Sequence, residues 1–147
     1  MPLNRYFFAF LLVSCSLFTN SLSAQCKSFA KKNVLPKLAP YITNGQLNTT
    51  TMTPGQSADM LLNFNSGQSY RIVVMGEGVL EPVEFSVIDA NGKTVFKNKD
   101  GDAYTDTWDF TVQQTTSLTL SVKVPEQVDK TQLNTEGCVS VLIGFKK

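Results

Sequence analysis

The 147-residue chain contains no histidine, one tryptophan, three cysteines and no excess of charge of one sign. Histidine is the commonest general base and metal ligand, so its absence excludes a Ser-His-Asp triad, a Cys-His pair and a histidine-containing zinc site. The 13 basic residues are balanced by 12 acidic ones. Because nucleic-acid-binding proteins carry a basic surface, the sequence predicts no nucleic-acid partner.

An export signal is predicted at the N-terminus. Arg5 precedes the apolar run Tyr6–Phe18, and a stretch of small polar residues then ends at Ala24. This order of charge, apolar run and small residues is typical of a secretory signal peptide. The apolar run is shorter than the roughly 20 residues that span a membrane. We therefore expect a signal peptide over residues 1–24 and a single exported domain, secreted or periplasmic, over residues 25–147.

A second processing site is the alternative. The sequence Leu12-Val13-Ser14-Cys15 resembles the lipobox of bacterial lipoproteins, in which the cysteine becomes the lipidated first residue. The next residues, Ser16-Leu17-Phe18, stay apolar where a lipoprotein changes to a polar tether. Cleavage after Ala24 is therefore favoured over a lipid anchor at Cys15.

Cleavage after Ala24 leaves two cysteines, Cys26 and Cys138, near the two ends of the domain. An even number of cysteines in an exported chain predicts a disulfide. The chain-entropy model values the closure of so long a loop at roughly 4–5 kcal/mol. Two free thiols are the alternative. A catalytic cysteine is disfavoured, because the chain has no histidine and no Cys-x-x-Cys pair to activate a thiol.

Apolar side chains alternate with polar ones from Gln46 to the end of the chain, which predicts strands. The residues that we expect to share a face, strand by strand, are Ala58, Met60, Leu62 and Phe64; Tyr70, Ile72 and Val74; Val83, Phe85 and Val87; Trp108, Phe110 and Val112; Leu118, Leu120, Val122 and Val124; and Val139, Val141, Ile143 and Phe145. A strand within Gln46–Thr53, and another around Val95 after the hairpin signal Asn91-Gly92, bring the number to about eight.

Short strands with frequent turn signals predict an all-β fold, a two-sheet antiparallel β-sandwich that is jelly-roll-like. Only Ser28–Leu35 has helical character, and Pro36 and Pro40 keep this N-terminal helical segment short. The segment is basic, and we expect it to pack across one end of the sandwich.

Three segments carry a family resemblance. Gly67–Val74, Phe85–Phe96 and Trp108–Val112 place apolar strands around an Asp-x-x-Gly hairpin. This order resembles bacterial pre-peptidase C-terminal domains and is similar to GOLD domains. The resemblance spans roughly Ser57–Phe145, and it implies a small β-sandwich that accompanies or presents other activities without being a catalyst.

The segment Asn98–Asp106 is the densest acidic stretch. Asp100, Asp102 and Asp106 offer oxygen ligands at the spacing that a calcium ion accepts, but the glycine comes too early for an EF-hand and no glutamate stands at its twelfth position. A solvated loop is favoured over a calcium site, so no cofactor is expected. With Asp109, these carboxylates are also the candidate acid/base pair of a glycosidase, which needs one carboxyl with a raised pKa across a cleft. Chance clustering is favoured over catalysis.

Two aromatic residues are candidates for binding. Tyr104 and Trp108 would form a stacking platform for a sugar ring, but Trp108 has the same parity as Phe110 and Val112, which favours a place in the core.

Arg71, the one arginine beyond residue 24, points to the opposite face from Tyr70. With four outward apolar residues it would border an exposed protein-binding patch. The favoured alternative is that sheet edges or the N-terminal segment cover these apolar residues, which are Leu61, Val73, Met75 and Leu142.

The sequence therefore favours an exported, non-catalytic β-sandwich that binds a protein or a glycan and has no transmembrane segment after cleavage. The alternatives are a histidine-free hydrolase that uses the loop carboxylates, and a structural envelope or inhibitor protein.

Overall fold

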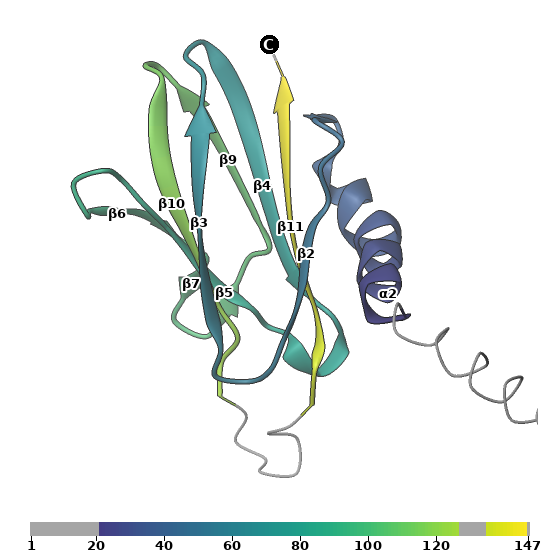
Figure 1. Ribbon diagram of the computed structural model, residues 1–147. Helices are drawn as coiled ribbons and strands as arrows, with labels where there is room; N and C mark the ends of the chain where they lie inside the picture. Colours follow the sequence, from purple (N-terminus) through teal and green to yellow (C-terminus); the bar gives the residue numbers. More distant parts are fainter. Residues whose placement is uncertain (1–20, 127–134, 147) are drawn as a thin grey trace, which may run out of the picture.

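The computed structural model describes residues 21–126 and 135–146, in which two antiparallel sheets face each other and a helical segment covers one of them (Figure 1). Most of the predicted signal peptide, and the lipid-anchor alternative at Cys15, lie outside the described residues. The predicted cleavage site after Ala24 falls within the first described helix. No helix in the described part of the chain is long and apolar enough to cross a membrane.

Apart from the β5–β6 hairpin, the strands that pair in the two main sheets are distant in sequence. Sheet A contains β1 (Ile42–Thr43), β2 (Asn48–Met52), β4 (Gln68–Gly76), β9 (Thr107–Val112) and β11 (Gly137–Lys146). Sheet B contains β3 (Ser57–Phe64), β5 (Glu84–Ile88), β6 (Thr94–Lys97) and β10 (Thr116–Lys123). The remaining elements after the helical segment are the hairpin of β7 (Lys99–Asp100) and β8 (Ala103–Tyr104) and the 3-10 turn η3 (Gly78–Leu80).

The strand orders are those of a jelly roll. Sheet A runs β2-β11-β4-β9, with β1 continuing the line of β2 along β11, and sheet B runs β3-β10-β5-β6. Eight strands in two facing antiparallel sheets with this order form a double Greek key. The predicted fold class is therefore confirmed.

Most of the core between the sheets consists of side chains that the alternation predicted to face inward, but Met52 and Leu80 of the core were not among them, and Ala58, which was, is exposed. Ile72, Val87 and Leu120 are among its fully buried members. In β6 the inward residue is Phe96, whereas Val95 is 45% exposed. The two sheets are therefore joined by one continuous apolar layer, with aromatic side chains at the β6–β9 side.

The N-terminal helical segment is longer than predicted. It consists of α2 (Ser21–Phe29), the π-helical turn η1 (Ala30–Val34) and the 3-10 turn η2 (Leu35–Leu38). It lies along the outer face of sheet A, beside β2 and β11, so the expected position across one end of the sandwich is wrong (Figure 1).

The physical reason is a second apolar cluster on the outer face of sheet A. Phe29, Val34 and Leu38 of the segment pack there against Val73 of β4 and Leu142 of β11. All five are buried, so strands β4 and β11 bury side chains on both faces.

A glycine allows the segment to approach the sheet closely. A Cβ atom at Gly144 of β11 would lie 2.7 Å from the Cβ of Tyr41, closer than two such atoms approach. The same Cβ would lie 3.2 Å from Cδ2 of Leu38, so Gly144 leaves room both for the end of the segment and for Tyr41 beyond it.

Candidate functional site

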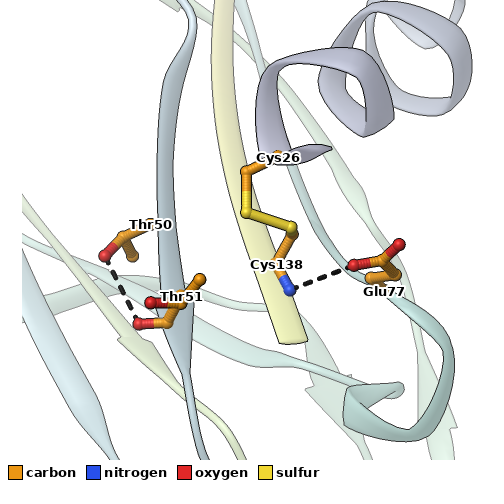
Figure 2. The surroundings of a disulfide bond; sticks show 5 residues. All are labelled: Cys26, Thr50, Thr51, Glu77 and Cys138. Carbon is orange, nitrogen blue, oxygen red and sulfur yellow. Dashed lines mark hydrogen bonds between the residues drawn. A yellow bond between two sulfur atoms is a disulfide. The ribbon is translucent and has the colours of Figure 1, made fainter. Parts of the chain in front are cut away.

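The structure contains the predicted disulfide. Cys26 of α2 and Cys138 of β11 are joined, with their Cα atoms 5.2 Å apart, and both are buried (Figure 2). The Cys138 backbone N–H also donates to the Glu77 carboxylate at 3.3 Å. The bridge therefore fastens the helical segment to sheet A as well as closing the chain.

The calcium candidates do not come together. Asp100 and Asp102 are exposed in the β7–β8 hairpin, and no group of three or more carboxylates or cysteines in the described residues could hold a metal ion. Asp106 instead forms an ion pair with Lys37 of η2 and accepts a hydrogen bond from the Thr107 hydroxyl at 2.8 Å. Burial acts to raise the pKa of Asp106, but the hydrogen bonds from Lys37 and Thr107 outweigh it and the pKa lies below its ordinary value.

The fourth candidate carboxylate, Asp109, is paired with Arg71. Two hydrogen bonds of 2.7 Å join the guanidinium to the two carboxylate oxygens, between opposite residues of β9 and β4. The Arg71 guanidinium holds the pKa of Asp109 below its ordinary value. A glycosidase needs one carboxyl with a raised pKa to act as the general acid, and neither Asp106 nor Asp109 has one.

Arg71 also holds the end of the helical segment. Its guanidinium donates to the backbone carbonyls of Lys37 at 3.1 Å and Ala39 at 2.8 Å, and it lies 4.7 Å from the centre of the Tyr41 ring. Arg71 and Asp109 thus join β4 and β9 to the segment, and these contacts occupy both side chains.

The two aromatic candidates have different surroundings. Trp108 is half-buried and stacks on Phe96 and Phe110, with ring centres 4.8 and 4.1 Å apart and planes tilted by 15° in both pairs. Its ring is thereby part of the aromatic contact between the two sheets. Tyr104 donates to the Glu84 carboxylate at 3.1 Å, and it borders a hollow of about 460 Å³ that Asp106 also lines.

The apolar patch considered around Arg71 is mostly covered. Val73 and Leu142 are fully buried beneath the helical segment, and Met75 packs partly buried beside them. Leu61 lies on β3 of the other sheet, where it is 69% exposed. The structure therefore does not bring these four residues together.

Leu61 belongs to a different feature, which the sequence did not reveal. A hollow of about 500 Å³ lies between β3, the loop before β2 and the ends of β4 and β11. An adjoining hollow of about 250 Å³, mostly apolar, lies between β2 and β3. Together they run along one open side of the sandwich, and we name them the edge groove.

The edge groove has polar walls with little charge and an apolar floor. Five side-chain amides line its larger part, namely those of Asn44, Gln46, Asn63, Asn65 and Gln68. Tyr70, Ile143 and Phe145 also line this part. Among all the described residues that line either part, Asp59 is the single charged one.

The larger part of the groove lies where the strand along β11 is interrupted. β1 and β2 both pair with β11, but the loop from Asn44 to Leu47 separates them. Gly45 adopts a φ of +85°, which favours glycine, and the Asn44 side chain accepts a hydrogen bond from the Gln46 N–H at 3.0 Å. This turn places the side chains of Asn44 and Gln46 at the groove.

Comparisons with known proteins leave the family open. No family model matches the chain, and no curated protein matches it. The solved structures to which it is similar include the periplasmic lysozyme inhibitor PliG of Aeromonas hydrophila, an inhibitor of g-type lysozyme, at 12% identity over 73% of this chain and 89% of that chain, with a TM-score of 0.49. The PliG of Salmonella Typhimurium matches at 14% identity over 68% and 89%, with a TM-score of 0.42.

A de novo designed double-stranded β-helix matches at 15% identity over 69% of this chain and 99% of that chain, with a TM-score of 0.33. Likeness at TM-scores below 0.5 and such identities establishes neither a shared ligand nor a shared activity. The resemblance to pre-peptidase C-terminal and GOLD domains stays a prediction.

Proposed function

We propose that this chain is an exported, non-catalytic jelly-roll protein that binds a protein partner through the edge groove. The groove itself supports this proposal, because it is a hollow with an apolar floor, amide walls and one charged residue, Asp59, at an open side of the sandwich.

The state of the carboxylates supports a non-catalytic role. Asp106 and Asp109 are held in ion pairs with Lys37 and Arg71, and the pKa of each carboxyl is lowered. These pairs fasten the helical segment to sheet A. The carboxylates of Asp106 and Asp109, which the hydrolase alternative would use, therefore stabilise the fold instead.

The strand edges favour a polypeptide as the ligand. β2 pairs only with β11 and β3 only with β10 among the described strands, so each has a second main-chain edge beside the groove. An extended segment of a partner can pair with such an edge while its side chains enter the adjoining hollow. Side-chain amides satisfy the remaining main-chain groups of an extended peptide without requiring charge.

A glycan is the second candidate, and the aromatic residues weigh against it. Trp108 stacks on Phe96 and Phe110, and Tyr70 of the groove is 6% exposed. Neither ring is available as a broad platform for a sugar.

Affinity capture from the native secretome tests the proposal, with the chain from Gln25 onward as bait. Leu61→Asp places a charge in the groove, whereas Val95→Asp places the same charge on β6 of the same sheet, at a residue 45% exposed. We expect the unaltered chain and Val95→Asp to capture the same protein, and Leu61→Asp to lose it. If both variants retain the partner equally, the groove is not the binding surface. If only a glycan is captured, the proposal of a protein partner is wrong.

Export is tested separately with a reporter fusion. Cys26, Phe29 and Ala30 are buried, while Ser23 and Ala24 are exposed, so cleavage after Ala24 removes no side chain that the described structure buries. Deletion of residues 5–18 should abolish export of the fusion. Export that persists after this deletion would rule out the leader.

A further inference from the structure

A further hollow, also of about 460 Å³, lies on the outer face of sheet B beside the β7–β8 hairpin. Lys97, Lys99 and Lys123 line it together with one carboxylate, that of Glu84. Three ammonium groups and one carboxylate give these lining residues a formal charge of +2.

Strand register brings the basic side chains together. Lys123 of β10 lies opposite Glu84 of β5, and in the next row Ser121 of β10 lies opposite Ser86 of β5, which lies opposite Lys97 of β6. Opposite residues of an antiparallel sheet point to the same face. Two hydroxyl groups therefore lie between the lysines on the floor of the hollow, because Ser86 and Ser121 also line it.

A buried amide fixes the chain between two of the lysines. Asn98 is 4% exposed, and its side chain donates to the carbonyls of Val83 at 2.8 Å and Thr105 at 3.0 Å. The same side chain accepts a hydrogen bond of 2.7 Å from the Phe85 N–H. A buried polar side chain with this set of partners holds the backbone of Lys97 and Lys99 in place.

The side chain of Lys99 is also held at its ammonium group. Its ammonium group lies 2.9 Å from the Glu84 carboxylate, which also accepts from the Tyr104 hydroxyl. Interactions with Tyr104 and Glu84 raise the pKa of Lys99, and the hydrogen bond from Lys99 lowers the pKa of Glu84. Both groups therefore stay charged at neutral pH, and the excess positive charge of the hollow comes from Lys97 and Lys123.

We propose that this hollow is a binding site for a phosphate group, either free or carried by a small ester. A phosphate monoester has a charge of about −1.5 to −2 at pH 7, which matches the +2 of the lining residues. Lysine ammonium groups bind phosphate as point charges, and serine hydroxyls donate to its oxygens. The volume also lies within the roughly 300–1,000 Å³ of small-molecule sites.

Isothermal titration of the chain from Gln25 onward tests the site, with inorganic phosphate and glucose 6-phosphate as probes and glucose as the unphosphorylated control. The double variant Lys97→Gln/Lys123→Gln removes two charges from the hollow. Lys31→Gln/Lys32→Gln removes the same charge from exposed residues of η1, on the other sheet. The melting temperature of each variant reports whether it is folded.

We expect saturable binding of at least one phosphate probe and none of glucose. Binding should weaken about tenfold or more in Lys97→Gln/Lys123→Gln and less than about twofold in Lys31→Gln/Lys32→Gln. Tighter binding of glucose 6-phosphate identifies an ester as the ligand, and tighter binding of inorganic phosphate identifies the free ion. The absence of saturable binding to either probe, or an equal loss in both double variants, would overturn the proposal.

Discussion

The outer faces of the two sheets differ in what covers them. On sheet A, Val73 and Leu142 are 0% exposed because the helical segment lies over them (Figure 1). On sheet B, Leu61 is 69% exposed, and the neighbouring outer positions on β10 are Ser117, Thr119 and Ser121. The layer over sheet A is therefore packed like part of the core, whereas no such layer covers Leu61 on sheet B in the described residues.

The disulfide is the strongest restraint on the covered face. Replacement of Cys26 and Cys138 by serine should lower the free energy of unfolding by roughly 4 kcal/mol, because the closed loop has a sequence separation of 112 residues. The helical segment should also loosen from sheet A and expose its apolar cluster. Urea unfolding and binding of a hydrophobic dye measure the two effects. A loss below about 1 kcal/mol, with no dye binding, would show that packing alone holds the segment.

The same substitution on each face gives a direct contrast. Leu142→Ala should cost about 3 kcal/mol, because it leaves a cavity between sheet A and the segment. Leu61→Ala should cost less than about 0.5 kcal/mol, because the side chain is mostly in water. Urea unfolding of both variants checks the pair. Equal costs would mean that the segment does not cover sheet A in solution.

The Arg71–Asp109 pair gives a smaller, pH-dependent effect on the covered face. The pKa of Asp109 is lowered from 3.8, so its contribution to stability is complete above that pH and is lost as the pH falls through the folded-state pKa. Asp109→Asn should therefore cost about 0.5–1 kcal/mol at pH 7 and close to nothing near pH 2. Urea unfolding across this range measures the difference, with Asp59→Asn on sheet B as the control. The same pH dependence in both variants would show that the Arg71–Asp109 pair does not cause it.

Alternation along the chain predicted the fold well, because each strand has one inward face and turn residues mark its ends. The sequence indicates in part that the outer face of sheet A is covered. Ile72-Val73-Val74 and Val141-Leu142-Ile143 are continuous apolar runs, which are typical of strands that are buried on both faces. The helix was underestimated because residues 21–24 read as the end of a leader. Its place on sheet A depends on long-range packing at Val73 and Leu142, which local pattern does not specify.

The sites were harder to predict than the fold. The candidate carboxylates could be identified from their charge. Their partners could not, because Asp106 and Asp109 pair with cations about 70 and 40 residues away in sequence. The edge groove could not be predicted because its amides carry no charge pattern and come from three separate parts of the chain, namely the loop before β2, the end of β3 with the turn after it, and the start of β4. The basic hollow depends on the register of three strands, which brings Lys97 and Lys123 together.

We expect the open side of the sandwich, and not its covered face, to bind the partner. Hydrogen–deuterium exchange of the chain with and without the captured protein tests it most directly. The outer main-chain edges of β2 and β3 have no strand partner among the described residues, so their amides should exchange rapidly in the free chain and slowly in the complex. We predict new protection in residues 44–52 and 57–65. Protection confined to the helical segment, or to β6 and β9, would contradict the claim.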